Sequence, residues 1–118
     1  MRQQPERAEQ AAIVKLLKLL GASVYVIGTK RRKGDYQGTM QTPGIPDLFV
    51  HLPAKQTSDR VGSLYPRTAL WIEVKAKGGK HSEAQNRFAI ENADTVVPYL
   101  TGGIDVVTDW LRQGGWIK

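Results

Sequence analysis

Residues 70–75 read Leu-Trp-Ile-Glu-Val-Lys, an apolar run that ends with two charged residues. Side chains alternate faces along a strand, so Glu73 and Lys75 share one face while Val74 points to the other, into a core. Two charges are a poor end for a buried strand unless something at that end uses them. The stretch therefore predicts a strand of the core with a candidate site at its end.

A second apolar run, residues 48–50, directly follows Pro46 and Asp47. If the two runs are neighbouring strands, they bring the Asp47 carboxylate close to that of Glu73, with Lys75 nearby. Carboxylate oxygens are hard ligands that suit a divalent metal ion, and a lysine can stand beside the reacting group. The same residues have a plainer interpretation, in which Asp47 is a turn residue and Glu73 and Lys75 are a solvated pair.

The bulk composition favours a nucleic-acid partner. The 118 residues suit a single domain, 1–118, with one core. Seventeen Lys and Arg against eleven Asp and Glu give a formal net charge of +6, which favours binding to polyanions. The absence of cysteine excludes disulfides and thiolate metal sites, and the presence of only two histidines argues against zinc hydrolase chemistry.

No segment has the pattern of a targeting or membrane-spanning sequence. The chain opens without a signal-peptide pattern. No apolar run approaches the roughly 20 residues that a bilayer requires. We therefore expect an intracellular protein.

Glycine and proline divide the sequence into alternating elements. We expect helices over residues 5–20, 83–92 and 104–112, and strands over residues 23–27, 45–52, 68–76 and 95–100. The order α-β-β-β-α-β-α predicts one α/β domain with a small mixed sheet flanked by helices. Two long connections, the glycine-rich 28–44 and the polar 54–68, join the first three strands.

The first predicted helix carries acidic residues on its apolar side. Its apolar stripe, extended backwards by steps of three and four, reaches Glu9 and Glu6. Gln10 lies four residues after Glu6, so these two side chains are neighbours on the helix. A carboxylate on the core-facing side needs a reason, although acidic residues also suit the positive end of a helix dipole.

Four stretches together resemble the VRR-NUC (virus-type replication-repair nuclease) domains of the PD-(D/E)xK nuclease superfamily. In the family's order they are residues 6–10 (Glu-Arg-Ala-Glu-Gln), 44–48 (Gly-Ile-Pro-Asp-Leu), 71–75 (Trp-Ile-Glu-Val-Lys) and 78–85 (Gly-Gly-Lys-His-Ser-Glu-Ala-Gln). The tail, 96–111, is compatible with the family's last strand and helix. The connection 54–68 departs from the pattern, because it is longer than the short hairpin that the resemblance implies.

The resemblance implies a fold of the PD-(D/E)xK type and a metal-dependent phosphodiesterase site. Its catalytic residues would be Glu6, Asp47, Glu73, Lys75 and Gln85. The metal, Mg²⁺ with Mn²⁺ as a substitute, would be held by Asp47, Glu73 and the Val74 backbone carbonyl. Glu6 would bind the ion directly or through water.

Two of these residues retain a second interpretation. Glu9 also lies on the apolar side of the helix, but the family's glutamate is followed by a glutamine four positions later, as Gln10 follows Glu6. The resemblance therefore favours Glu6 over Glu9. Gln85 lies three residues after Ser82, which is the spacing of a helix capping box, and the resemblance adds that its side chain faces the site. We retain both roles for Gln85.

Basic residues are expected to surround this site. The strongest local run is Lys30-Arg31-Arg32-Lys33, in the connection that leads to Asp47. Charge runs are usually solvated surface, but a run beside a phosphodiester site would contact the DNA backbone and position it without reading bases. Lys77, Lys80 and Arg87 would extend the same positive rim.

These features predict a metal-dependent, structure-specific endonuclease for branched DNA such as Holliday junctions. Standalone bacterial and phage members of the family resemble dimeric junction nucleases, so the resemblance also implies a homodimer. The segment 54–68, with Trp110 and Trp116, is its candidate interface. The alternatives are a nuclease directed to flaps or nicks, a sequence-reading restriction-type nuclease, and a non-catalytic DNA-binding module of the same fold.

Overall fold

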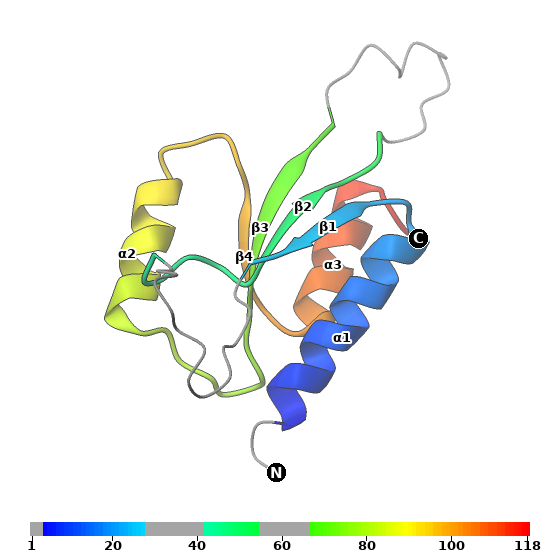
Figure 1. Cartoon of the computed structure of the whole chain (residues 1–118). Helices are drawn as coiled ribbons and strands as arrows, with labels where there is room; N and C mark the ends of the chain where they lie inside the picture. Colours follow the sequence, from blue (N-terminus) through cyan, green and yellow to red (C-terminus); the bar gives the residue numbers. More distant parts are fainter. Residues whose placement is uncertain (1–3, 28–41, 55–66) are drawn as a thin grey trace.

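The computed structural model describes residues 4–27, 42–54 and 67–118. Its helices are α1 (Gln4–Leu19), α2 (Glu83–Asn92) and α3 (Ile104–Gly114), and its strands are β1 (Ser23–Val26), β2 (Leu48–His51), β3 (Ala69–Val74) and β4 (Tyr99–Gly102) (Figure 1). The predicted order α-β-β-β-α-β-α is confirmed. The basic run 30–33 and most of the connection 54–68 lie outside the described residues.

The four strands form one mixed sheet in the order β1-β2-β3-β4. β1 pairs with β2, and β2 with β3, in antiparallel fashion, whereas β3 and β4 are parallel. Parallel neighbours need a crossover connection, and here it contains α2. The predicted α/β class and mixed sheet are therefore confirmed.

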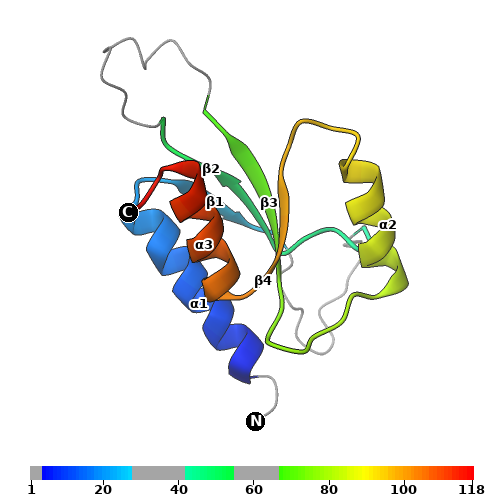
Figure 2. The ribbon, with the colours of Figure 1, turned by 180° about the vertical axis from the view of Figure 1, so that it is seen from behind.

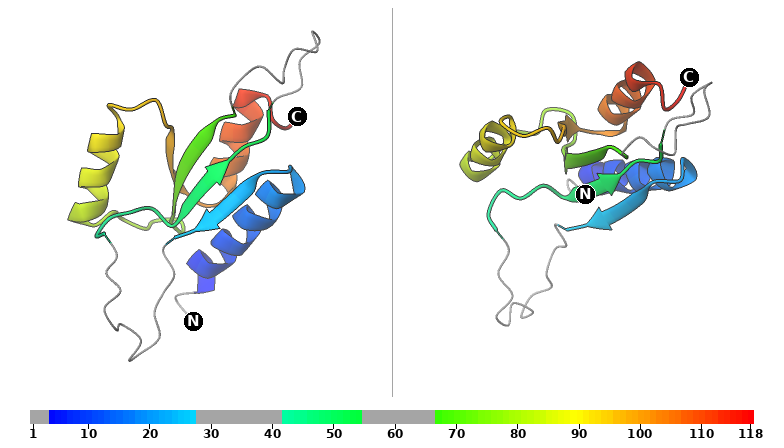
Figure 3. Two further views of the ribbon diagram at one scale, coloured as in Figure 1. Left: turned by 45° about the horizontal axis from the view of Figure 1, so that its top comes forward. Right: turned by 90° about the horizontal axis from the view of Figure 1, so that it is seen from above.

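Two of the helices bury one face of the sheet. α1 and α3 lie together on one side of it, and α2 lies on the other side (Figures 2 and 3). The core consists of buried aliphatic side chains of α1, α3 and the strands, among them Ile13, Leu17, Leu48, Val50, Leu70, Ile72, Val74, Val107 and Leu111. α2 contributes no buried residue to it. In the described part of the chain, no helix has the length and apolar character needed to cross a membrane.

The last strand differs from its prediction, because it covers residues 99–102 rather than 95–100. Side-chain hydrogen bonds form a turn after α2 instead: Thr95 Oγ1 donates to the Asn92 carbonyl over 2.8 Å, and Asn92 Nδ2 donates to the Val97 carbonyl over 2.7 Å. Such local bonds compete with strand pairing even where the sequence is β-branched. As a result β4 reaches Gly102, which pairs with Val74 at the end of β3.

The start of β2 also differs from its prediction. The strand begins at Leu48 rather than at residue 45. A turn precedes it, in which the Ile45 N–H donates to the Thr42 carbonyl over 3.2 Å. This turn leads into Pro46 and Asp47, so Asp47 stands at the mouth of the strand rather than inside it.

Candidate active site

The antiparallel register of β2 and β3 brings the two predicted carboxylates to the same strand ends. Leu48 pairs with Ile72, so Asp47 faces Glu73 one position further on. Asp47 Oδ2 accepts a 2.8 Å hydrogen bond from the backbone N–H of Val74. This bond ties the turn before β2 to the end of β3 and holds one carboxylate beside the other.

Glu73 is the centre of this arrangement. Its side chain is only 3% exposed, and it is the sole buried charged residue in the described part of the chain. Its Oε2 accepts a 2.9 Å hydrogen bond from Gln85 Nε2 and lies 3.8 Å from Lys75 Nζ. Its Oε1 is buried and has no partner among the described residues. Because a buried oxygen without a partner is costly, this atom is a candidate ligand for a bound group.

The surroundings of Glu73 favour its neutral form in the absence of a cation. Burial and then the negative charge of Asp47 raise the pKa of Glu73 from 4.5 to about 8, although the positive charge of Lys75 lowers it in part. Burial and the charges of the same two carboxylates raise the pKa of Tyr99 to about 12. Shifted pKa values of this kind are typical of functional sites.

The structure distinguishes the two acidic residues of α1. Glu9 Oε1 accepts a 2.6 Å hydrogen bond from the backbone N–H of Ile104, the first residue of α3. A side chain at Gly103 would collide with this carboxylate, so glycine permits the contact. Glu9 therefore caps α3, which explains why it faces inward. Glu6 is exposed, and its charge contributes to the raised pKa of Glu73.

Gln85 makes both contacts expected of it. Its Oε1 accepts a 2.8 Å hydrogen bond from the Ser82 N–H, and Ser82 Oγ accepts a 3.1 Å bond from the Gln85 N–H, which completes a capping box. The same amide donates from Nε2 to Glu73. Because the cap fixes the amide oxygen, the amide nitrogen is already oriented toward the carboxylate.

Gly44 joins the turn before β2 to the start of α2. Its φ of +85° is unfavourable for other residues, and a side chain there would collide with the carbonyl oxygen of Ala84. The backbone that leads to Asp47 therefore packs directly on the helical turn that carries Gln85. Two residues of the site thus come from segments in direct contact.

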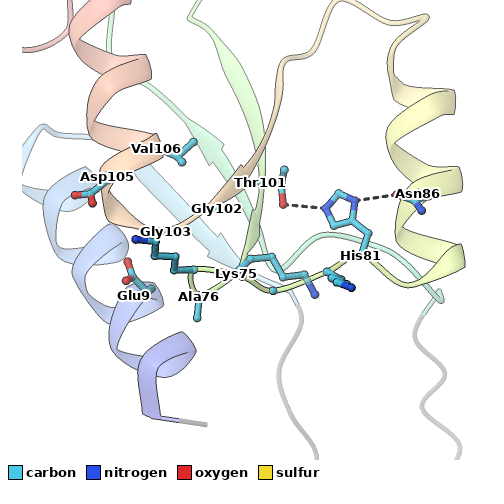
Figure 4. Close-up of a pocket in the computed structure, with 14 residues that line it drawn as sticks. Glu9, Lys75, Ala76, His81, Asn86, Thr101, Gly102, Gly103, Asp105 and Val106 are labelled. Atoms are coloured by element: carbon cyan, nitrogen blue, oxygen red, sulfur yellow. Dashed lines mark hydrogen bonds between the residues drawn. The ribbon is translucent and has the colours of Figure 1, made fainter. Parts of the chain in front are cut away.

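An open pocket of about 790 Å³ follows the end of β3 and is lined by residues 75–81, by the end of β4 and by the start of α3 (Figure 4). Lys75 lines this pocket while its Nζ remains near Glu73. The exposed Lys77 and Lys80 line it too, together with the backbones of the glycine pairs 78–79 and 102–103. The lining also includes the carboxylates of Glu9 and Asp105, so its charge is mixed, with three lysines and several backbone groups that could contact a phosphate.

The sequence assigned no role to His81 or Tyr99, which the structure places beside the site. His81 Nδ1 lies 3.0 Å from Asn86 Oδ1, and its Nε2 lies 2.8 Å from Thr101 Oγ1, so the ring joins α2 to β4 across the pocket (Figure 4). The Tyr99 hydroxyl is buried without a partner in the described part of the chain. Correct bounds for β4 would have placed Tyr99 on the face of Glu73, but no local signal identifies His81.

The donor atoms present fit a magnesium or manganese ion. Within residues 4–27, 42–54 and 67–118, no three Asp, Glu or His side chains converge as a complete metal cage. Mg²⁺ does not need one, since it commonly binds through one or two carboxylates and keeps several waters. Asp47 and Glu73 supply two hard oxygen donors, and Glu73 Oε1 forms no hydrogen bond with the described residues.

Comparisons with protein-family models, with curated proteins and with solved structures gave no match. The candidate site therefore rests on its own geometry, and the resemblance to VRR-NUC domains stays a prediction from four sequence stretches.

The raised pKa of Glu73 predicts how stability depends on pH without metal. Its pKa of about 8 in the folded state exceeds the ordinary 4.5, so between these values the folded protein holds a proton that the unfolded chain has lost. The free energy of unfolding in EDTA should therefore fall as pH rises from about 5 to about 8. Urea denaturation at several pH values measures this slope.

Glu73→Gln should remove much of that pH dependence and unfold at higher urea than the wild type at pH 8. The matched control is Glu91→Gln, since Glu91 is exposed on α2 and should leave the slope unchanged. An equal slope in the wild type and Glu73→Gln would contradict the assignment.

Proposed function

We propose that this chain is a divalent-metal-dependent DNA endonuclease with the fold and site of the PD-(D/E)xK nucleases. The observation that carries the proposal is the pair Asp47 and Glu73 at adjacent strand ends, with Lys75 Nζ 3.8 Å from Glu73. A buried carboxylate with a second carboxylate beside it costs stability unless a cation or a proton neutralises the charge. Two carboxylates with a lysine beside them, and two further exposed lysines on the neighbouring pocket, together suit the hydrolysis of a phosphodiester.

Each residue of the site has a defined role in this proposal. Asp47, Glu73 and the Val74 carbonyl would hold Mg²⁺ or Mn²⁺, with Glu6 bound directly or through water. When bound, the ion neutralises charge at the phosphate and lowers the pKa of the attacking water. Lys75 would orient that water or help to deprotonate it, and would stabilise the charge that develops on the phosphate oxygens.

Gln85 acts through Glu73 rather than on the phosphate. Its hydrogen bond occupies Glu73 Oε2, which leaves Oε1 as the oxygen for the cation. Asp47 is held in a similar way, because the Val74 N–H occupies its Oδ2. Each carboxylate is thus fixed through one oxygen by a neutral donor.

The proposed DNA contacts are to the backbone. Lys77 and Lys80 are exposed on the pocket that Lys75 also lines, and the chain carries a net charge of +6. The basic run 30–33 belongs to the same proposal, although it lies outside the described residues. Such contacts fix the register of a substrate and make its binding depend on salt.

Branched DNA is the proposed substrate class, and Holliday junctions are its first candidate. A two-fold homodimer would supply the paired cuts that a junction requires.

Two residues of the candidate dimer interface, Trp110 and Trp116, already make contacts within the chain. Their rings stack with centroids 5.2 Å apart, both pack on the core, and Trp116 Nε1 donates to the Pro53 carbonyl. The segment 54–68 remains the proposed interface, of which 55–66 are not described.

Substitution of the carboxylates and the lysine tests the proposal. Asp47→Asn, Glu73→Gln and Lys75→Ala should each lower cleavage by at least about 100-fold, the usual effect of losing one group that stabilises developing charge. DNA binding should change little. The measurement is cleavage of labelled four-way junction, flap, nicked and linear DNA with Mg²⁺, Mn²⁺, Ca²⁺ or EDTA, with light scattering for the oligomeric state.

Asp109→Asn is the control for these variants, because Asp109 is exposed on α3 and pairs only with Arg112 among the described residues. Calcium should support binding without turnover, since its coordination is looser. Binding without cleavage in every metal would contradict the enzyme and favour a DNA-binding module. Preference for a flap would replace the junction as substrate.

The two acidic residues of α1 should give opposite results. Glu6→Ala should lower metal-dependent cleavage while changing the melting temperature little, because Glu6 is exposed. Glu9→Ala should destabilise the fold by about 1 kcal/mol through loss of the cap on α3. Thermal melts and cleavage rates on both variants check this, and a cleavage loss confined to Glu9→Ala would reverse the assignment.

Variants of Ser82 and Gln85 distinguish two roles of Gln85, the capping of α2 and the positioning of the Glu73 carboxylate. Ser82→Ala removes one bond of the capping box, whereas Gln85→Ala removes the box and the bond to Glu73. Both should lower the melting temperature, but only Gln85→Ala should also shift the pH profile of cleavage, because it changes the surroundings of Glu73. Parallel pH–rate profiles for the two variants would show that Gln85 only caps the helix.

A further inference from the structure

The sheet face that carries the two carboxylates also carries a row of aromatic side chains. The strand register aligns Tyr25 with Phe49, Phe49 with Trp71, and Trp71 with Tyr99, one residue from each strand. Ring centroids lie 6.5 Å apart for Tyr25 and Phe49, and 4.5 Å apart for Phe49 and Trp71. These four residues are called the aromatic row below.

An aromatic surface is unexpected at the β1–β2 end of this face. A sheet with one face buried by helices normally presents polar side chains on its other face. Here the face away from α1 and α3 presents aromatic rings, and Tyr25 is 49% exposed. α2 reaches only the β3–β4 end of the row, where Phe88 contacts Trp71 and Tyr99. The β1–β2 end is partly exposed.

The aromatic row is continuous with the proposed active site. Phe49 lies two residues after Asp47, and Trp71 lies two residues before Glu73. Alternate residues of a strand share a face and are about 6.6 Å apart at 3.3 Å per residue. A strand of DNA with its phosphate at the carboxylates would therefore place a neighbouring base over Phe49, at the end of the row that α2 leaves partly exposed.

We propose that the aromatic row stacks an unpaired base next to the scissile phosphate. The substrate would then be DNA with at least one unpaired nucleotide at the cut. The inference rests on the proposed nuclease function for the phosphate, but the stacking surface is a separate prediction. Proteins that bind single strands without reading sequence combine aromatic rings that stack on bases with basic residues that contact the backbone, and here Lys75 follows the row on β3.

A second copy of this chain is the other candidate occupant of the row. It fits less well, because a protein that packs on Phe49 would also cover Asp47 and Glu73. Each carboxylate lies only two residues from the aromatic row along its own chain segment. A nucleic-acid strand needs both surfaces at once. Continuity with the carboxylates therefore favours a base over a protein partner.

Binding measured in Ca²⁺ tests the inference without turnover. Tyr25→Leu and Phe49→Leu keep apolar bulk but remove the π face. Each should weaken binding of a short labelled single strand, and of a duplex with one unpaired nucleotide, by about 5- to 100-fold. Val26→Ala is the matched control, because Val26 is equally exposed at 49% but alternates to the other face of the sheet.

A change in the DNA provides a second measurement with unaltered protein. Replacing the unpaired nucleotide by an abasic residue should weaken binding to a similar extent, and this loss should largely disappear in the double variant Tyr25→Leu, Phe49→Leu. Unchanged affinity of both single variants, or of the abasic DNA, would overturn the inference. So would a loss of dimer in light scattering with DNA affinity unchanged, since the row would then join two copies.

Failure of the nuclease and failure of the stacking surface give different results. Base-dependent binding without cleavage in Mg²⁺ or Mn²⁺ would support stacking while rejecting the enzyme. If neither the abasic residue nor Tyr25→Leu changes the cleavage rate, the stacking surface would be rejected and the nuclease function supported.

Discussion

The burial of the Glu73 carboxylate beside Asp47 is the constraint on which the site depends. A carboxylate that is 3% exposed needs hydrogen bonds, a nearby positive charge or a proton. Here Gln85 donates to one oxygen, Lys75 stands 3.8 Å away, and a pKa of about 8 keeps the proton in the absence of a cation. Lys75 follows Glu73 on the same chain segment, but Gln85 comes from α2 and Asp47 from the turn before β2, so the fold must hold these segments together.

Close contacts of the backbone at two glycines keep these segments in place. Gly44 lets the turn before Asp47 touch the first turn of α2, and Gly103 lets Glu9 of α1 reach the start of α3. The capping box of α2 then orients Gln85 toward Glu73. Elements far apart in sequence are thereby fixed relative to one strand end, without any of these residues belonging to the aliphatic core.

Local pattern was sufficient for the parts of the structure that depend on alternation and periodicity. The element order, the mixed sheet and the pairing of Asp47 with Glu73 all follow from where apolar runs begin and end. The bounds of β4 do not follow from the local pattern. Residues 95–97 are β-branched, but the hydrogen bonds of Asn92 and Thr95 form a turn there instead of a strand. The cap by Glu9 joins residues 95 positions apart, which no local pattern reveals.

One face of the sheet packs the aliphatic core, and the other face carries the candidate site. Val50, Leu70 and Ile72 point toward α1 and α3 and are completely buried, so their contribution is packing. Phe49 and Trp71 alternate with them and share their face with the carboxylates. A row of rings and a pair of acids on one face cannot be attributed to the core that lies beneath the other. The aromatic composition of that face must therefore be explained by what the site binds or by what covers it, and its continuity with Asp47 and Glu73 favours the ligand.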